Sequence, residues 1–347
     1  MSTDPRIPRE SNPVATARGL AATVAWTLLA LFLANLVAGA YLQRYGRNEG
    51  FQLIREKWRL LFERKEPVDW LILGDSSGNQ GIDPAVFRER NQGSALNLCT
   101  IGELLALNDA WMLESWLEHA DPPRKGVVIT HVYDVWHRGV NASVLGKVPL
   151  PWGYWEDRRP ELDLSGTQVW QLFVARYLPL YAENLSLIAA LGAGRDAFER
   201  HPPVDADGFK AEVLPNEAAV EKDARGHEAF VAKSRFRMSK VNEQALRRIL
   251  ALAEERDFDV YVVNGPLYEG LLRDPRFHAY YEDVVEKLDA LTAGHRRAHY
   301  LLREPMTFPA EELVNADHLT AAGARRFTAR VLEEIADSQG GVVADPG

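Results

Sequence analysis

The sequence contains one cysteine, Cys99, among its 347 residues, so neither an intrachain disulfide nor a metal site built from several cysteines is possible. Basic residues are outnumbered, because 40 Lys and Arg face 49 Asp and Glu and leave a formal net charge of −9. Nucleic-acid-binding proteins normally carry a basic surface, so this balance argues against nucleic acid as a partner. Internal repeats and low-complexity tracts are also lacking, and a hydrophobic content of 46% is enough for one large domain or two small ones.

Charged residues are missing altogether from residues 19–42, which are almost wholly apolar. A helix of that length extends about 36 Å, enough to cross a bilayer with some tilt. The sequence therefore predicts a disordered N-terminus over residues 1–18 and a single transmembrane helix over residues 19–42. The alternative is a cleaved signal peptide, because Ala38-Gly39-Ala40 resembles a cleavage site, but the apolar run is longer than such peptides carry.

Residues 43–67 mix both signs of charge at helical spacing, which predicts a solvated helical stalk between the span and the folded domain. Basic residues are denser on this side of the span than before it. Taken literally, the positive-inside rule would keep the following domain in the cytoplasm, although long domains translocate largely regardless of such charge. The charges therefore leave the side of the membrane open.

An apolar run from Val68 to Leu73 ends abruptly in Gly74-Asp75-Ser76-Ser77. The run is short, begins with a β-branched residue and is bounded by glycine, so it predicts a buried strand. Open α/β sheets place their sites at the carboxyl ends of the strands, where a serine can expose its hydroxyl. Asp and Ser also cap helices well, so this stretch alone fits either a helix cap or a nucleophile.

A second stretch near the end of the chain reads Asn315-Ala-Asp-His-Leu-Thr-Ala-Ala-Gly323. Its Asp317 and His318 stand just before a predicted helix over residues 320–336. A serine near the start of the domain and an acid–histidine pair near its end supply the nucleophile, base and orienting group of acyl transfer.

With these two blocks, the chain resembles the SGNH/GDSL hydrolase superfamily over roughly residues 68–335. The membrane-anchored arrangement is similar to polysaccharide O-acyltransferases and to accessory proteins of teichoic acid D-alanylation. The resemblance implies a three-layer α/β/α, flavodoxin-like domain over residues 68–340, with a helical insertion at residues 138–233. The insertion could form a lid, a partner surface or the core of a small subdomain.

The resemblance implies that Ser76 is the nucleophile and His318 the base. In the family the orienting acid stands three residues before the histidine, and this chain has Asn315 there. Asp317 lies directly before His318 and could accept the ring N–H if its backbone turns suitably, whereas Asn315 could accept through its carbonyl oxygen. Both residues are kept as candidates.

The oxyanion hole implied by the resemblance uses the N–H groups of the nucleophile and of Gly102, with Asn79 as a further candidate donor. Gly102 could equally be a glycine at a strand-to-helix turn. Tyr133 stands where the family's third block has its oxyanion-binding asparagine, so Tyr133, His131 or Asn79 could supply this third donor. Asp75, Tyr133 and Asn264 are the candidate substrate-binding residues.

His131, Asp134 and His137 have loose metal-ligand character, but they follow one another at a strand end and no further acid–histidine cluster accompanies them. The sequence therefore predicts neither a metal nor another cofactor.

The sequence and the resemblance together predict a membrane-anchored serine esterase or O-acyltransferase that acts on an acylated cell-envelope glycan or polymer. The expected partner is a membrane-bound O-acyltransferase, and the resemblance places the large domain outside the cytoplasmic membrane. The alternative is a non-catalytic subunit that uses the same scaffold to bind a glycan or that acyltransferase.

Overall fold

The computed structural model describes residues 13–46, 49–199 and 203–340, and its centre is a five-stranded parallel sheet. The strand order is β2-β1-β3-β4-β6. The chain therefore begins with β1 inside the sheet, adds β2 at one edge, and then adds β3, β4 and β6 toward the opposite edge. This doubly wound order has its switch point between β1 and β3. The five strands are β1 Trp70–Gly74, β2 Ala95–Asn97, β3 Gly126–His131, β4 Val260–Asn264 and β6 Ala298–Leu301.

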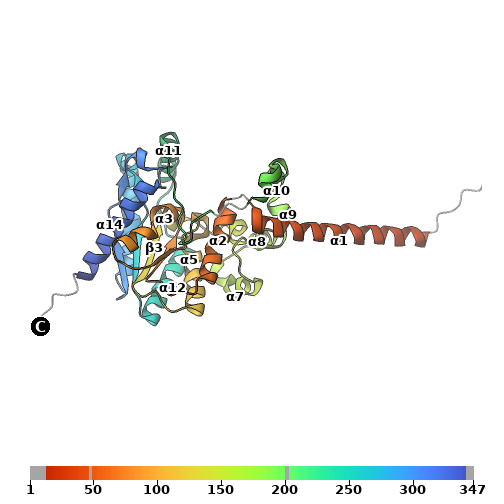
Figure 1. Cartoon of the computed structure of the whole chain (residues 1–347), viewed down its shortest axis with the longest axis horizontal. Helices are drawn as coiled ribbons and strands as arrows, with labels where there is room; N and C mark the ends of the chain where they lie inside the picture. Colours follow the sequence, from red (N-terminus) through yellow and green to blue (C-terminus); the bar gives the residue numbers. More distant parts are fainter. Residues whose placement is uncertain (1–12, 47–48, 200–202, 341–347) are drawn as a thin grey trace, which may run out of the picture.

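Helices cover both faces of the sheet, because successive strand residues point to opposite sides. In β1, Trp70 and Ile72 join one apolar cluster, and Leu71 and Leu73 join the other. The first cluster is completed by α4 Pro84–Glu89 and α14 Ala321–Gly340, and the second by α5 Leu105–His119, α12 Lys240–Arg256 and α13 Pro275–Thr292. Figure 1 shows α14 on one side of the sheet and α5 and α12 on the other, so the predicted three-layer α/β/α fold is confirmed.

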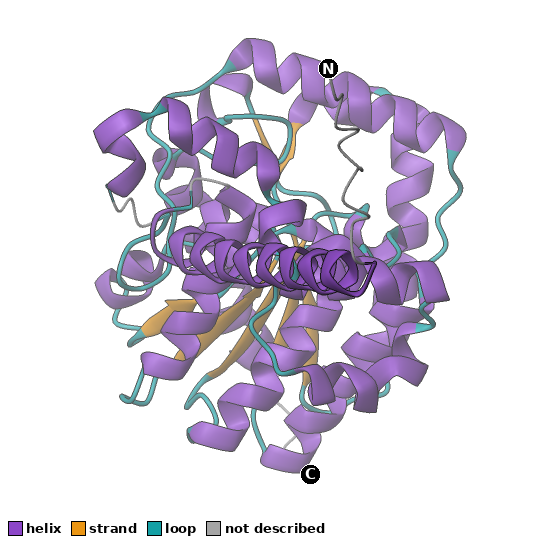
Figure 2. Ribbon diagram, turned by 90° about the vertical axis from the view of Figure 1, so that its right-hand side faces the viewer, coloured by secondary structure: helices purple, strands orange, loops and turns teal. Residues whose placement is uncertain are grey.

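The long helix α1, Pro13–Tyr45, extends away from the sheet (Figure 1), and Figure 2 looks along it toward the domain. An 18-residue window within its segment Arg18–Tyr45 has a mean hydropathy of 2.1 and is unburied, so the segment is long and apolar enough to cross a membrane. Residues 13–18, predicted to be disordered, extend this helix instead. Residues 1–12 of that predicted segment lie outside the described residues.

The helix α2, Glu49–Glu63, corrects the prediction of a solvated stalk, because it packs against α5 as part of the folded domain. Ile54 and Trp58 are fully buried, and so is Lys57. The Lys57 ammonium donates hydrogen bonds to the carbonyl oxygens of Asn97, at 2.9 Å, and of Gly208. Helical spacing that gathers charges on one face gathers apolar residues on the other, and that apolar face decides where the helix lies.

The remaining elements lie mainly in the predicted insertion and around the carboxyl edge of the sheet. Helices α8 and α10 flank the short α9 beside α1, whereas α11 packs against α13. These α-helices and strands are α3 Ser76–Gly81, α6 Ala142–Leu145, α7 Trp152–Leu162, α8 Gly166–Tyr177, α9 Pro179–Ala182, α10 Asn184–Gly192, α11 Glu217–Lys233, β5 Leu267–Tyr268 and β7 Thr307–Phe308. Short 3-10 helices span Gly102–Leu104, Val135–His137, Gly194–Phe198, Glu269–Arg273 and Ala310–Glu312.

Candidate active site

The turn after β1 is held tightly against the neighbouring strand. Gly74 has a φ of 147°, and a Cβ there would lie 1.9 Å from the carbonyl oxygen of Thr130 in β3. Only glycine fits such an approach, and the Asp75 N–H then donates to the same oxygen at 3.1 Å. The start of α3 is therefore fixed at the switch point of the sheet, where open α/β folds place their sites.

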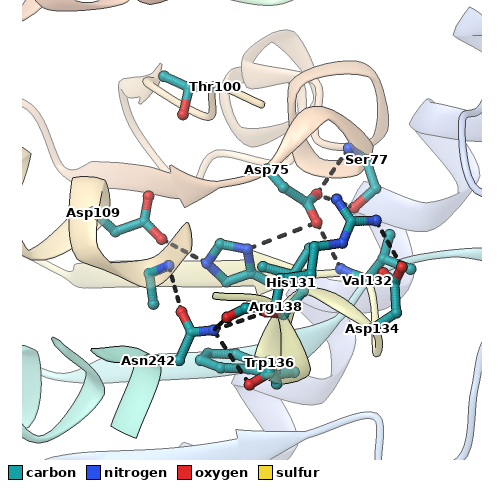
Figure 3. Close-up of polar contacts among 12 residues, drawn as sticks. Asp75, Ser77, Thr100, Asp109, His131, Val132, Asp134, Trp136, Arg138 and Asn242 are labelled. Atoms are coloured by element: carbon teal, nitrogen blue, oxygen red, sulfur yellow. Dashed lines mark hydrogen bonds and ion pairs between the residues drawn. The ribbon is translucent and has the colours of Figure 1, made fainter. Parts of the chain in front are cut away.

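Asp75 faces the protein interior and caps α3. One carboxylate oxygen accepts the Ser77 N–H at 2.9 Å and the Ser77 hydroxyl at 2.6 Å, and the other accepts the Val132 N–H at 2.8 Å (Figure 3). Burial opposes its charge, but these hydrogen bonds and the nearby His131 hold the pKa of Asp75 well below its usual range. This corrects the predicted substrate contact, because Asp75 is almost fully buried and positions the turn instead.

The two serines of the turn differ in exposure. Ser77 is fully buried and its hydroxyl is used by Asp75, whereas Ser76, the first residue of α3, is partly exposed. Among the described residues, no side-chain hydrogen bond is recorded for Ser76. Ser76 is therefore the serine of this turn whose hydroxyl is available to a ligand.

A buried histidine lies beneath this turn. His131 ends β3, its Nε2 lies 2.6 Å from Asp109 of α5 and its Nδ1 lies 3.7 Å from Asp75 (Figure 3). Burial disfavours the charged ring, but the two carboxylates outweigh it and raise the pKa of His131 to about 9. Burial raises the pKa of Asp109. Sequence analysis missed Asp109, because nothing in a mid-helix aspartate indicates which strand it faces.

The loop before α14 folds around His318. Leu313 and Leu319 form an antiparallel bridge, and the Val314 N–H donates to the His318 carbonyl at 2.8 Å. This narrow loop brings both sequence candidates to one ring nitrogen. Nδ1 of His318 lies 2.6 Å from Asn315 Oδ1 and 2.5 Å from Asp317 Oδ1.

The charges around His318 favour the protonated form of its ring. Burial disfavours its imidazolium, but Asp317, with smaller contributions from Asp75 and Asp223, outweighs burial and raises the pKa of His318 above its ordinary value. Since Nδ1 faces the Asn315 amide oxygen and the Asp317 carboxylate, Nε2 is the nitrogen left to exchange a proton with a ligand.

Helix α3 packs against α14, so the Ser76 and His318 regions meet at the same edge of the sheet. A Cβ on Gly81, at the end of α3, would contact Leu319 and Phe327. Asp75, directly before Ser76, is near enough for its charge to act on His318. No hydrogen bond between Ser76 and His318 is recorded in the described part of the chain.

Helix α11 of the insertion supports the His318 loop, which the sequence did not indicate. Asp223 accepts the Ala316 N–H at 3.2 Å and lies 3.6 Å from Nε2 of His227, one helical turn later. Burial opposes the charge of His227, but Asp223, Asp317 and Asp134 raise its pKa. The i, i+4 spacing of Asp223 and His227 is the only sequence signal for this pair, and such spacing is common on solvated helices.

The donor atoms of Asp223, His227 and Asp317 all lie within 4.8 Å of one another, so these three residues are the described group best placed to hold a cation. Several of these atoms already have protein partners. Nδ1 of His227 bonds the Tyr133 hydroxyl at 2.8 Å, and Asp317 faces His318. The Asp223 carboxylate, which accepts the Ala316 N–H, joins the loop to α11.

Gly102 begins a 3-10 helix at the carboxyl end of the sheet and lies against Arg138. A Cβ at Gly102 would come within 2.8 Å of Nη1 of Arg138, whose Nη2 bonds Asp134 at 2.6 Å. Figure 3 shows Arg138 and Asp134 beside Asp75 and Ser77. Sequence analysis did not single out Arg138, which adds a cation next to a predicted oxyanion donor.

Asn79 lies on α3 and is almost fully buried. Neither of its side-chain polar atoms has a partner among the described residues. A buried amide without partners is costly, so it calls for a ligand or a bound water. This setting suits the predicted donor role, which stays a prediction.

Tyr133 and Asn264 are almost fully buried, and their predicted substrate contacts stay a prediction. Tyr133 packs edge-on against Phe277 and bonds His227 through its hydroxyl. Asn264 donates to the Tyr300 hydroxyl at 2.7 Å. The loop after Asn264 does reach the expected edge, since a Cβ on Gly265 would lie 2.6 Å from the Ser77 hydroxyl.

Comparisons with known proteins leave the family open. No protein-family model and no curated protein matches the chain. A solved structure from Streptococcus pneumonia, named provisionally as a platelet activating factor, is similar over 87% of this chain and 99% of its own, with 10% identity and a TM-score of 0.39. A likeness this distant carries no information about activity.

Proposed function

We propose that this protein is a membrane-anchored serine acyl-transfer enzyme with Ser76 as nucleophile and His318 as base. The observation that carries the proposal is the contact of His318 Nδ1 with Asp317 and Asn315, in a loop beside the helix that begins at the partly exposed Ser76. An oriented histidine within reach of an exposed serine hydroxyl activates that serine, and the proposal is that His318 and Ser76 come within such reach when substrate binds.

In the proposed reaction, the Ser76 hydroxyl attacks the carbonyl carbon of an acyl ester while Nε2 of His318 takes its proton. The resulting oxyanion is held by the N–H groups of Ser76 and Gly102 and by the Asn79 amide, with the Arg138 cation nearby. Collapse breaks the ester C–O bond, and His318 gives its proton to the leaving alcohol. Water or an acceptor hydroxyl, deprotonated by His318, then attacks the acyl carbon. The bond between that carbon and the Ser76 oxygen breaks, and His318 returns the proton to Ser76.

Asp317 and Asn315 divide the orienting role in this scheme. Asn315 accepts the Nδ1–H through its amide oxygen and fixes the ring, and the Asp317 charge stabilises the imidazolium formed in each step. The two candidates that the sequence left open are thus complementary.

For the substrate and location, we propose an acylated envelope glycan or polymer, handled outside the cytoplasmic membrane together with a membrane-bound O-acyltransferase. The apolar α1 supports membrane anchoring, and the resemblance to polysaccharide O-acyltransferases motivates the rest. The location is tested by fusing a reporter that is active only after export to the C-terminus. Activity of a cytoplasm-only reporter at the same position would refute it.

The mechanism is tested by labelling the detergent-purified full chain with a fluorophosphonate probe and mapping the adduct by mass spectrometry. We expect an adduct on Ser76 and ester turnover that is lost in Ser76→Ala. Ser77→Ala is the matched control, with turnover reduced only mildly. Full turnover by Ser76→Ala would exclude the serine mechanism, and neither label nor turnover in the wild type would favour the non-catalytic scaffold.

A further inference from the structure

A set of exposed apolar side chains lies on α9, α10 and the residues around them. Large apolar side chains there face outward: Leu180, Tyr181, Leu185, Ile188 and Leu191. The only charged residue between Arg176 and Arg195 is Glu183, which is buried and pairs with Lys147 at 2.6 Å. This surface therefore offers almost no charge to water, unlike the usual surface of a soluble helix.

The same segment is attached to α1 within its apolar run. Asn35 of α1 donates from Nδ2 to the Tyr177 carbonyl at 2.8 Å and accepts the Leu180 N–H at 3.2 Å. These two backbone groups lie where the chain breaks between α8 and α9. Figure 1 shows α9 and α10, in green, beside the part of α1 nearest the domain.

Hydrogen bonds to the Tyr177 carbonyl and the Leu180 N–H matter most where water is absent. In hydrocarbon, each backbone polar group must find an internal partner, and an asparagine side chain can supply one. Asn35 is the only amide side chain between residues 19 and 42, and it hydrogen-bonds both exposed backbone groups at the break between α8 and α9.

The position of Asn35 gives the depth of the contact. It lies seven residues before Leu42, the end of the apolar run, which corresponds to about 10 Å along the helix axis. Helices that lie in a membrane surface bury their apolar face about 5–10 Å below the headgroups. The contact with α9 thus falls at the depth of an interfacial helix.

We propose that α9 and α10 insert beside α1 into the outer part of the bilayer leaflet next to the domain, as a second membrane contact. This inference requires that α1 spans the membrane, and it is independent of the chemistry at Ser76. It applies whichever side of the membrane the domain occupies.

Aromatic residues at the end of α1 fit the same arrangement. Tyr41 donates its hydroxyl to the Ala197 carbonyl at 2.7 Å, and Phe198 packs edge-on against Tyr41 and Tyr45. Tyrosines are typical of the boundary between lipid and water, where the ring is buried and the hydroxyl is satisfied. The 3-10 helix Gly194–Phe198, which follows α10, is therefore held at the level of the headgroups.

The arrangement also bears on the alternative of a cleaved signal peptide. Cleavage near Ala38-Gly39-Ala40 would remove Asn35 and leave the helix break at Tyr177 and Leu180 without these partners. The contacts thus favour a retained α1.

The test places one fluorescent label on the proposed lipid contact and one on a matched control. Leu185 and Leu214 are both 78% exposed, but Leu214 shortly precedes α11, a helix that lies away from α1 (Figure 1). Leu185→Cys and Leu214→Cys are made in the full chain, whose only native cysteine, Cys99, is buried. Each is labelled with an environment-sensitive nitrobenzoxadiazole dye and reconstituted into phosphatidylcholine–phosphatidylglycerol vesicles that hold no other protein.

We expect a nitroxide near the headgroup end of the lipid acyl chains to quench the label at residue 185 several-fold more than the label at 214. Aqueous iodide should show the opposite preference. If iodide quenches both labels equally and the lipid nitroxide quenches neither, α9 and α10 do not contact lipid. That result would overturn the proposal and indicate that a protein partner covers this surface.

A second measurement needs no substitution. The unmodified full chain is reconstituted with a phospholipid that carries a photoactivatable diazirine on its acyl chain, and adducts are mapped by mass spectrometry. Adducts on residues 180–191 as well as on α1 support the proposal, whereas adducts on α1 alone overturn it. Adducts on neither would refute the spanning α1 itself, and all three results are independent of fluorophosphonate labelling at Ser76.

Discussion

His131 and His318 each contact carboxylate groups near the carboxyl edge of the sheet, yet their settings differ. The His131 side chain at the end of β3 is 1% exposed and lies between Asp75, in the turn after β1, and Asp109 of α5. The His318 side chain is 16% exposed and lies on a loop, where Asn315 and Asp317 share one of its nitrogens. Carboxylates raise the pKa of both rings against the effect of burial.

The difference shows what separates a structural histidine from a reactive one. Both nitrogens of His131 face carboxylates inside the protein, so its charge stabilises the turn that carries Ser76 and cannot reach a substrate. His318 has its acceptors on Nδ1, which leaves Nε2 for proton exchange at a partly open site. A raised pKa is thus common to both roles, and access decides between them.

The largest expected effect comes from removing the reactive histidine. His318→Ala should lower kcat for a generic acyl ester by about 10⁴-fold, because the nucleophile loses its base. The thermal midpoint should change little, since the ring is partly exposed. Combining it with Ser76→Ala should cost no more than either change alone. Turnover within a few-fold of wild type would remove His318 from the mechanism.

Removing a partner of the structural histidine should act on stability. Asp109→Ala leaves a buried cation without its main partner, and we expect a loss of about 3–5 kcal/mol in the free energy of unfolding. Asp289→Ala is the control, because its pair with Arg303 is half-exposed and worth about 0–1 kcal/mol. Denaturant unfolding of both variants measures the contrast, and equal losses would contradict the structural role.

The position of His131 between two carboxylates also predicts a pH dependence of the free energy of unfolding. The folded pKa of His131 is about 9, above its ordinary 6.5, so its contribution is fully present below pH 6.5 and is lost as pH rises through 9. The loss is on the order of 3 kcal/mol. Unfolding free energies measured across this range should fall in the wild type and stay flatter in the neutral His131→Gln, Asp109→Asn double variant. An unchanged slope in that variant would assign the dependence to other groups.

The smallest effects separate the two acceptors on His318. Asp317→Asn removes the charge that raises the pKa of His318, so the acid limb of the kcat/KM profile should move to lower pH, and kcat should fall about a hundredfold. Asn315→Ala should cost about tenfold without that pH shift, because the charge remains. If Asn315→Ala is the more damaging change, orientation by the amide outweighs stabilisation by the carboxylate.

Local patterns in the sequence predicted the buried strand before Gly74 and the apolar span, and the resemblance carried by the blocks around Ser76 and His318 implied the α/β/α sheet. Strand ends, glycine turns and apolar runs are read within a few residues, and parallel strands bring their carboxyl ends to one edge. The resemblance singled out Asn315 and its neighbour Asp317 as candidates, but it did not indicate that both would face Nδ1 of His318.

Only the tertiary structure decided which polar residues face the interior. The burial of Asp75, Tyr133 and Asn264 and the packing of α2 depend on neighbours far away in the chain, such as Tyr300 or α5. The same holds for His131 with Asp109 and for Asn35 with the break before α9. A residue's type fixes which hydrogen bonds it can make, but the fold fixes which partners are near and whether water can replace them.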